Sequence, residues 1–259
     1  MVKEAVKSAT GEKFAVKVIS KKMLQGKEFL ILNEIDILQQ VSKGHPNIIT
    51  LHDYFESPSN LYLVFELCQG GELFDRICER GNFYEKDAAA IVRAVIDAVA
   101  YLHEHNIVHR DLKPENLLYR FKPENTEDFA KGLVIADFGL SKIIDSQKMS
   151  VLNTTCGTPG YMAPEVLRHI PYSKPVDMWS VGVLTYFLLV GYTPFDSDHS
   201  AEEVTRVINA QYTFEPAEYW SGVSEDAKDF IRSLLKVNPD ERMTALQVRL
   251  VLKGEGRFF

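Results

Sequence analysis

The sequence has few cysteines, no long apolar run and no excess of basic residues. The three cysteines, Cys68, Cys78 and Cys156, are odd in number and not spaced like metal ligands, which indicates a reducing, intracellular compartment. The first residues are charged and lack the apolar core of a signal peptide. A net charge of -7 at pH 7 argues against a nucleic-acid-binding or membrane-surface protein, since either normally carries a basic face. We therefore expect a cytoplasmic location, with the nucleus as the alternative, and neither nucleic acid nor membrane among the partners.

The longest apolar run covers residues 179–190 and is interrupted by Ser180, Gly182 and Thr185. It is too short to span a bilayer, so it predicts a buried core helix. Otherwise the composition is that of an ordinary globular protein: 46% of the 259 residues are hydrophobic and 25% are charged. A chain of this length buries a sizeable core and fits one large domain or two lobes.

Hydrophobic periodicity predicts strands early in the chain and helices afterwards. Alternating residues indicate strands over 2–7 and 14–19, and two more strands are expected over 48–55 and 61–66, with a turn at residues 57–60 between them. Helical spacing indicates helices over 27–41, 88–106, 177–190, 202–210 and 225–235. The pattern changes near Gln69-Gly70-Gly71, which predicts a short hinge. Strands followed by helices favour the α+β class, with a sheet lobe and a helical lobe.

Residues 109–116, HRDLKPEN, place a carboxylate, an ammonium group and a carboxamide at fixed spacings on a predicted short loop. A loop whose ends are held by a scaffold can direct several side chains at one point. Asp111 is suited to accept a proton from a substrate hydroxyl, Lys113 to neutralise a transferring phosphate, and Asn116 to hold a divalent cation. This spacing therefore favours phosphoryl transfer.

Three further motifs accompany that loop. Asp137-Phe138-Gly139 follows the apolar run 133–136, so an acidic residue stands at the exit of a predicted buried strand. Lys17 lies among apolar neighbours in the predicted strand 14–19. Ala163-Pro164-Glu165 follows the segment GTPGYM at 157–162.

Together these motifs resemble those of eukaryotic protein kinases, over about residues 2–246. Lys113 and GTP at 157–159 resemble the serine/threonine class. GGELFDRI at 70–77 and CGTPGY at 156–161 resemble the calcium/calmodulin-dependent protein kinase family. The resemblance implies a bilobal fold in which residues 1–68 form a small antiparallel-sheet lobe with one key helix and residues 69–246 a larger, mainly helical lobe. Residues 247–259 match nothing in that pattern.

The resemblance also implies a site for ATP and Mg²⁺, and transfer of the γ-phosphoryl group to Ser or Thr of protein substrates. Lys17 is expected to bind the α- and β-phosphates and to pair with Glu34. Asn116 and Asp137 are expected to hold Mg²⁺ through oxygen ligands. The adenine pocket is expected to contain Phe65 at its back, backbone groups of Glu66 and Cys68 at the base edge, and Ala15 and Leu118 on either side. Phe65 and Leu118 are equally compatible with plain core packing.

Three expectations concern the activation segment. In related kinases the Arg at the position of Arg110 meets a phosphate on the activation segment, so Thr154 is expected to be phosphorylated by an upstream kinase, with Thr155 the next candidate. Thr158 resembles the Thr that contacts the catalytic Asp and Lys. Glu165 and Arg242 resemble a buried ion pair that anchors the segment to the helical lobe.

Glu72 and Glu115 are candidates for receiving an Arg three residues before the phosphorylated Ser or Thr. Contact with ribose, or a solvated face, is the alternative at these positions. The charged stretch 120–132, which contains Pro123, is expected to be a solvated insertion.

The sequence departs from the family pattern at both ends. The glycine-rich loop that covers the ATP phosphates is expected before Val2, and no basic amphipathic helix of the calmodulin-target type follows residue 246. We therefore expect a chain truncated at both ends and weakly active or inactive as it stands, with calmodulin acting only through a missing tail. The alternative to an enzyme is a non-catalytic kinase-like module that binds partners or nucleotide.

Overall fold

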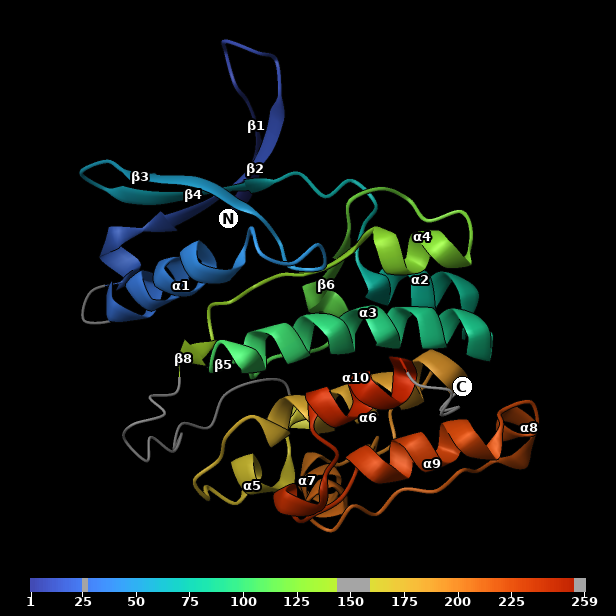
Figure 1. Cartoon of the computed structure of the whole chain (residues 1–259). Helices are drawn as coiled ribbons and strands as arrows, with labels where there is room; N and C mark the ends of the chain where they lie inside the picture. The colour runs from blue at the N-terminus through green and yellow to red at the C-terminus, as the bar shows by residue number, and fades with distance from the viewer. Residues whose placement is uncertain (25–27, 144–158, 254–259) are drawn as a thin grey trace.

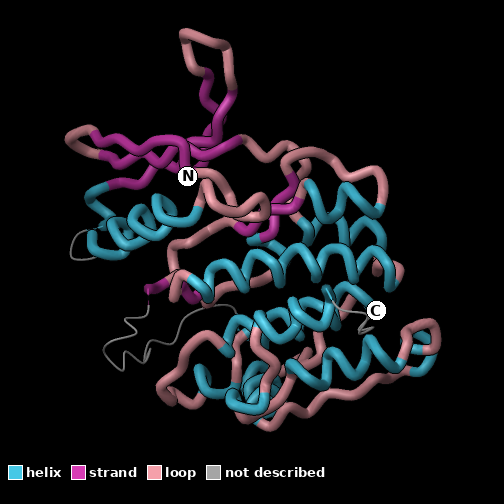
Figure 2. The backbone as a smooth tube through the Cα atoms, in the orientation of Figure 1, coloured by secondary structure: helices cyan, strands magenta, loops and turns pink. Residues whose placement is uncertain are grey.

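The computed structural model describes residues 1–24, 28–143 and 159–253. A small lobe containing a sheet lies above a larger helical lobe in Figure 1, and the chain passes between them after β4 (Asn60–Glu66) and before α2 (Leu73–Arg80). Strands gather in the small lobe, whereas helices make up most of the large one (Figure 2). The predicted α+β arrangement, a sheet lobe followed by a helical lobe, is confirmed.

The small lobe is a four-stranded antiparallel sheet in the order β1-β2-β4-β3, accompanied by one helix. Its elements are β1 (Val2–Val6), β2 (Lys13–Ser20), η1 (Lys21–Leu24), α1 (Glu28–Val41), β3 (Leu51–Glu56) and β4. The β1–β2 hairpin turns at Gly11, whose φ of 75° favours glycine. Ile35 and Leu38 are buried at helical spacing on α1, as predicted.

One strand begins later than predicted. The expected strand 48–55 starts only at Leu51, because Ile48 forms an isolated parallel bridge with Ile135 in the large lobe. The backbone N–H of Ile49 likewise donates to the carbonyl of Ile135 at 3.0 Å. This apolar stretch therefore joins the lobes instead of extending the sheet.

The large lobe is built mainly of helices that surround a central apolar one. In chain order its elements are α2, α3 (Glu85–Glu104), β5 (Ile107–Val108), η2 (Pro114–Asn116), β6 (Leu117–Tyr119), α4 (Thr126–Lys131), β7 (Leu133–Ile135), β8 (Lys142–Ile143), η3 (Pro159–Tyr161), α5 (Pro164–Leu167), α6 (Pro175–Val190), α7 (Ser200–Ile208), α8 (Ala217–Trp220), α9 (Glu225–Leu234), η4 (Pro239–Glu241) and α10 (Ala245–Lys253). The predicted helices 88–106, 177–190, 202–210 and 225–235 correspond to α3, α6, α7 and α9.

The central helix is α6, which is buried from its second residue to its last, as the apolar run predicted. A Cβ at Gly182 would lie 2.8 Å from Leu235 Cδ2 and 3.0 Å from Leu234 Cβ. Glycine is thus needed here for α6 and α9 to pack closely. A helix held so tightly is a rigid support for the polar residues at its N-terminal end.

The structure corrects the prediction for residues 120–132, which are not simply a solvated insertion. They contain α4, whose N-terminus is capped by Asn125: its side chain accepts hydrogen bonds from the backbone N–H groups of Glu127 at 3.0 Å and Asp128 at 3.2 Å. Phe129 is buried in the core. A helix of 6 residues with one buried apolar side chain leaves no periodicity to detect.

The chain after residue 246 continues as α10, which packs along α3. Thr244 and Gln247 form a capping box at its start: Gln247 N–H donates to Thr244 Oγ1 at 3.2 Å, and Thr244 N–H donates to Gln247 Oε1 at 2.8 Å.

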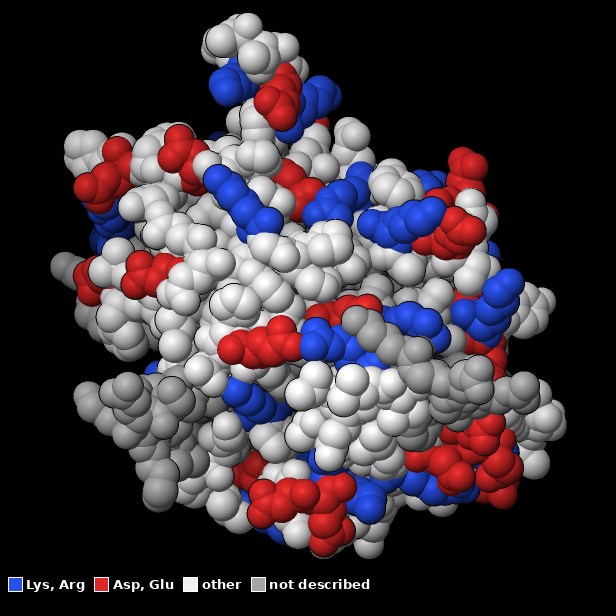
Figure 3. Space-filling model, viewed as in Figure 1, with Lys and Arg blue, Asp and Glu red and all other residues white. Residues whose placement is uncertain are grey.

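Charges of both signs are interspersed over the face shown in Figure 3. Among the helices of the described ranges, none has the length and apolarity that a membrane crossing requires.

Candidate active site

The lobes enclose a cavity of about 370 Å³ between the sheet and the loops after β5 and β7. It is lined by every residue predicted to contact nucleotide or metal, namely Ala15, Lys17, Glu34, Phe65, Glu66, Cys68, Glu72, Asn116, Leu118 and Asp137. The lining also includes Phe138 of the Asp-Phe-Gly motif and apolar residues that no motif had indicated, namely Leu38, Ile49, Leu67 and Ala136. A larger hollow of about 830 Å³ lies elsewhere, between α3 and α4, and contains none of the predicted site residues.

The sheet explains how one wall of the cavity arises. Ala15 and Lys17 are two residues apart on β2 and therefore point to the same face. Phe65 pairs directly with Ala15 across the β2–β4 ladder. Both apolar side chains thus lie beside the ammonium group of Lys17.

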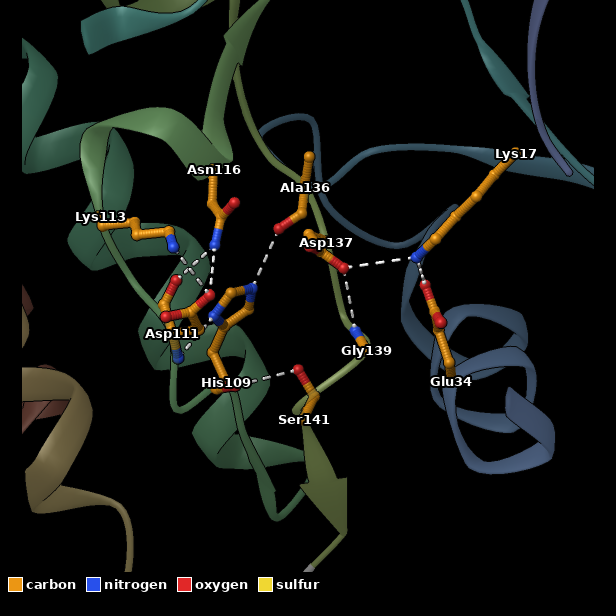
Figure 4. A network of polar contacts seen from close by, with 10 residues as sticks. All are labelled: Lys17, Glu34, His109, Asp111, Lys113, Asn116, Ala136, Asp137, Gly139 and Ser141. Carbon is orange, nitrogen blue, oxygen red and sulfur yellow. Dashed lines mark hydrogen bonds and ion pairs between the residues drawn. The ribbon is translucent and has the colours of Figure 1, made fainter. Parts of the chain in front are cut away.

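Lys17 connects three elements. Its Nζ lies 2.8 Å from Glu34 Oε1 on α1 and 3.4 Å from Asp137 Oδ1 after β7 (Figure 4). Burial opposes the charge on Lys17, but the two carboxylates outweigh it and raise the pKa of the lysine above its usual value. Lys17 is therefore a fixed cation at neutral pH, held between the lobes.

Asp137 is the acidic end of this arrangement. Its φ of 54° is unusual for a residue other than glycine, and Oδ1 accepts a hydrogen bond from the backbone N–H of Gly139 at 3.3 Å. Burial favours the neutral acid, but Lys17 and this N–H prevail and lower the pKa of Asp137. The carboxylate is ionised and half-exposed toward the cavity, as a metal ligand must be.

Three of the predicted catalytic side chains, Asp111, Lys113 and Asn116, lie together away from Lys17 and Glu34, and of these three Asn116 lines the cavity (Figure 4). Asn116 Nδ2 donates to Asp111 Oδ2 at 2.9 Å and to the Asp111 carbonyl at 2.7 Å. Lys113 Nζ lies 3.4 Å from Asp111 Oδ2. The amide oxygen of Asn116 points away from Asp111 and remains available as an acceptor. One loop thus presents a carboxylate, an ammonium group and an amide oxygen together.

This loop is anchored by a residue that sequence reasoning missed, Asp177 at the start of α6. The carboxylate accepts hydrogen bonds from the backbone N–H groups of His109 at 3.0 Å and Arg110 at 2.8 Å, and from His103 Nε2 at 2.8 Å. Burial would raise the pKa of Asp177, but these donors lower it. The sequence did contain a signal for Asp177, because an acidic residue in the first turn of a mainly apolar helix needs polar partners.

The buried His109 ring holds the loop against the strand that leads to Asp137. Its Nε2 donates to the carbonyl of Ala136 at 3.1 Å, and the ring packs edge-on against Phe138 at 4.9 Å between centroids. Burial lowers the pKa of His109, so the neutral ring serves as a spacer between two motifs.

Arg110 has a φ of 70°, donates through Nε to the carbonyl of Leu140, and lies 3.2 Å from the Tyr172 hydroxyl through Nη1. The candidate phosphorylation sites Thr154 and Thr155 lie outside the described residues, and so does Thr158, which was expected to contact the catalytic Asp and Lys.

The predicted pairing of Glu165 with Arg242 is present as a buried, two-pronged ion pair. Nη1 and Nη2 of Arg242 each donate to one carboxylate oxygen at 2.6 Å. The guanidinium also lies over the ring of Trp179, 5.1 Å from its centroid. This pair ties the segment after the A-P-E motif to the core of the large lobe.

Glu72 and Glu115 lie together at the cavity mouth. Burial, aided by Asp75 and Glu115, raises the pKa of Glu72. Glu115 Oε2 is buried and has no hydrogen-bond partner among the described residues. Such an atom is costly unless a donor reaches it.

A two-lobed fold with a lysine–glutamate pair, an Asp-Phe-Gly turn and an HRDLKPEN loop around one interlobe cavity defines the protein kinase class. The family comparison agrees, since the protein kinase domain matches residues 1–250, and the chain belongs to this family.

Its relatives include calcium/calmodulin-dependent protein kinases. The chain is 58% identical over 247 residues to the calcium/calmodulin-dependent protein kinase cmkB of Emericella nidulans, covering 95% of this chain and 60% of that protein. It is 54% identical over 245 residues to the type I enzyme of Schizosaccharomyces pombe, covering 94% and 71%. With the human type 1B enzyme, identity is 50% over 246 residues, covering 94% and 68%. The predicted kinase group is confirmed, and the chain spans 60–71% of the length of these relatives.

Proposed function

We propose that this protein transfers the γ-phosphoryl group of Mg·ATP to serine or threonine hydroxyls of protein substrates. The observation that carries the proposal is the 2.8 Å contact between Lys17 and Glu34, made beside Asp137 in the cavity that also receives Asn116. In protein kinases this ion pair and the metal-binding Asp must be in place together for catalysis.

The cavity fits the nucleotide. Its volume, about 370 Å³, lies in the range of small-molecule sites, and its apolar walls include Ala15, Phe65 and Leu118. We assign the base to these walls, with backbone groups of Glu66 and Cys68 at its edge. The phosphates then lie toward Lys17, the one cationic side chain among the described lining residues.

The donor set fits Mg²⁺. Asp137 supplies an ionised carboxylate and Asn116 an amide oxygen, the hard ligands that this ion prefers. No group of three or more His, Cys, Asp or Glu side chains that could hold a metal occurs in the described residues. Mg²⁺ needs no such cage in kinases, because substrate phosphates and water complete its coordination.

The chain's own residues divide the remaining work. Bound Mg·ATP supplies the transferable phosphoryl group and neutralises its developing charge. Asp111 orients the substrate hydroxyl and accepts its proton, and Asn116 holds Asp111 in place through two hydrogen bonds. Lys113, 3.4 Å from Asp111, places a positive charge beside the transferring group.

We assign partners by the same reasoning. Glu72 and the unpartnered oxygen of Glu115 favour a substrate with Arg three residues before the phosphorylated Ser or Thr. An upstream kinase acts on Thr154. The relatives' names favour calcium/calmodulin dependence of the full-length protein. We assign that control to a segment outside the kinase domain, and we assign the protein a cytoplasmic or nuclear location.

The test is Mg·ATP binding by calorimetry followed by phosphotransfer to an Arg-containing peptide. Asp111→Asn should lower turnover about a hundredfold or more and leave the Kd of Mg·ATP nearly unchanged. Asp137→Asn should weaken Mg·ATP binding. Near-normal turnover in Asp111→Asn would contradict the mechanism. Binding without any transfer by the unsubstituted protein would favour the non-catalytic module instead.

A further inference from the structure

Arg120, the residue after β6, makes three side-chain contacts that cross between the lobes. Its Nε lies 2.5 Å from Glu66 Oε2, its Nη2 lies 2.9 Å from Glu66 Oε1, and its Nη1 donates to the carbonyl of Pro46 at 2.6 Å. Glu66 Oε1 also accepts the backbone N–H of Thr50 at 2.8 Å. Glu66, Thr50 and Pro46 belong to the small lobe, whereas Arg120 belongs to the large lobe. One guanidinium therefore joins the two lobes.

The main chain of the same residue holds the other end of the hinge. Gln69 N–H donates to the carbonyl of Arg120 at 3.1 Å, and Gly70 N–H donates to the carbonyl of Tyr119 at 2.8 Å. The approach is so close that a Cβ at Gly70 would lie 2.3 Å from the Phe121 carbonyl oxygen. The hinge is thus fixed at Glu66 by a side chain and at Gln69 by a backbone bond, both from Arg120.

Between these two fixed points lie Leu67 and Cys68, which line the nucleotide cavity. The hinge backbone at Glu66 and Cys68 is where we place the edge of the adenine base. Burial works against the carboxylate of Glu66, yet Arg120 and the Thr50 N–H lower its pKa, so the pair is ionised at neutral pH. The side chains of Arg120 and Glu66 are 27% and 17% exposed, so solvent screens their attraction only in part.

The insertion keeps Arg120 in this position. Arg120 N–H donates to the carbonyl of Gly132 at 2.9 Å, closing the base of segment 120–132. Asn47, next to Pro46, donates through Nδ2 to the carbonyls of Ala130 at 2.8 Å and Leu133 at 2.7 Å. These bonds hold Arg120 close to the segment around Pro46, whose carbonyl its guanidinium contacts.

We propose that Arg120 is a positioning residue of the nucleotide site, which sets the hinge backbone at the adenine edge through its paired contact with Glu66 and its carbonyl bond to Gln69. The proposal rests on the function proposed above, because it concerns the affinity of that site for ATP. A planar guanidinium suits the role because it engages both carboxylate oxygens and a carbonyl at once, which an ammonium group cannot do.

The experiment measures the Kd of Mg·ATP and of adenosine, kcat at saturating ATP, and the melting temperature, all in the whole chain. Arg120→Ala should raise the Kd of both ligands by about tenfold and change kcat by less than about twofold. The hinge backbone at the adenine edge loses its support in this variant, whereas the catalytic loop keeps its contacts. Arg120→Lys and Glu66→Gln should each give a smaller rise. The double substitution Arg120→Ala with Glu66→Gln should weaken binding by less than the product of the single effects.

Two variants serve as controls. Lys131→Ala removes an exposed ion pair with Glu127 on the same insertion and should leave both Kd values unchanged. Lys17→Ala should raise the Kd of Mg·ATP but not that of adenosine, because Lys17 is placed at the phosphates, which adenosine lacks.

Unchanged Kd values in Arg120→Ala, with only a lower melting temperature, would overturn the proposal and leave a structural ion pair. If Arg120→Ala does not fold, the same comparison is made with Arg120→Lys and Glu66→Gln, and unchanged affinity in both has the same meaning. Failure of the unsubstituted protein to bind ATP would overturn the proposed function as well, so the two failures are distinguishable.

Discussion

The carboxylate of Asp177 accepts a hydrogen bond from the backbone N–H of Arg110 at 2.8 Å, although the two residues are 67 positions apart. Arg110 has a φ of 70°, a left-handed conformation that a residue other than glycine adopts at a cost of about 1 kcal/mol. A buried carboxylate on the most rigid helix offsets that cost. The geometry of Asp111 therefore depends on a residue that contacts no substrate.

We expect Asp177→Asn to lower the free energy of unfolding at pH 7 by about 2 kcal/mol and to reduce kcat. The folded-state pKa of Asp177 is lowered, so its stabilisation is fully present above the unfolded-state pKa of about 4 and is lost as pH falls through the folded-state value. Urea unfolding of parent and variant between pH 7 and pH 3 should show their difference shrinking. Asp36→Asn, at an exposed position on α1, is the control. A difference independent of pH would contradict the assignment.

The Glu165–Arg242 pair is buried, so removing one partner leaves an uncompensated charge. We expect Arg242→Met to lower the free energy of unfolding by about 3–5 kcal/mol, and Arg242→Lys to lower it by less because only the two-pronged geometry is lost. Urea denaturation measures both. Arg232→Ala, in an exposed pair with Asp229, should unfold almost like the parent. Equal effects of the Met substitution and this control would show that the buried pair contributes nothing.

Substrate preference should depend on Glu115. We expect Glu115→Gln to raise the KM of a peptide with Arg three residues before Ser by about tenfold, because a neutral amide replaces a carboxylate whose Oε2 has no partner among the described residues. The KM of the same peptide with Ala in place of Arg should change little. Glu79→Gln, on the exposed face of α2, is the matched control. An equal change for both peptides would favour the ribose contact instead.

Phosphorylation of Thr154 should raise activity through Arg110. We expect an upstream kinase to activate the parent protein several-fold and to leave Thr154→Ala unresponsive. The phosphate adds about two negative charges, with which the guanidinium of Arg110 can form an ion pair. Peptide phosphorylation before and after treatment is the measurement. Equal activation of the Ala variant would place the switch at Thr155 or elsewhere.

Much of the site was predictable from the sequence because its polar residues lie in short, recognisable motifs. Asp111, Lys113 and Asn116 stand within one loop, and Lys17 and Asp137 each sit in a distinctive strand or turn. Leu38, Ile49 and Ala136 were not assigned to the cavity because they are apolar residues in apolar runs, which any core contains.

The remaining features arise from pairings that no local pattern encodes. Arg120 and Glu66 are 54 positions apart, and either alone resembles a surface charge. Asp177 reads as the polar first turn of a helix until the loop it holds is known. Residues 48–50, Ile-Ile-Thr, are as apolar as the start of a strand, and only the bridge between Ile48 and Ile135 shows that they lie at the lobe junction.

The order of these contacts along the chain has a consequence for synthesis on the ribosome. The HRDLKPEN loop emerges first, the helix that fixes its backbone follows, and Arg242 emerges 77 residues after the glutamate that it neutralises. A domain folds as a unit, so the nascent large lobe cannot bury the carboxylate of Glu165 with its partner until Arg242 has been synthesised. Premature termination anywhere before residue 242 should therefore yield a polypeptide that aggregates or is degraded, not a kinase of reduced activity.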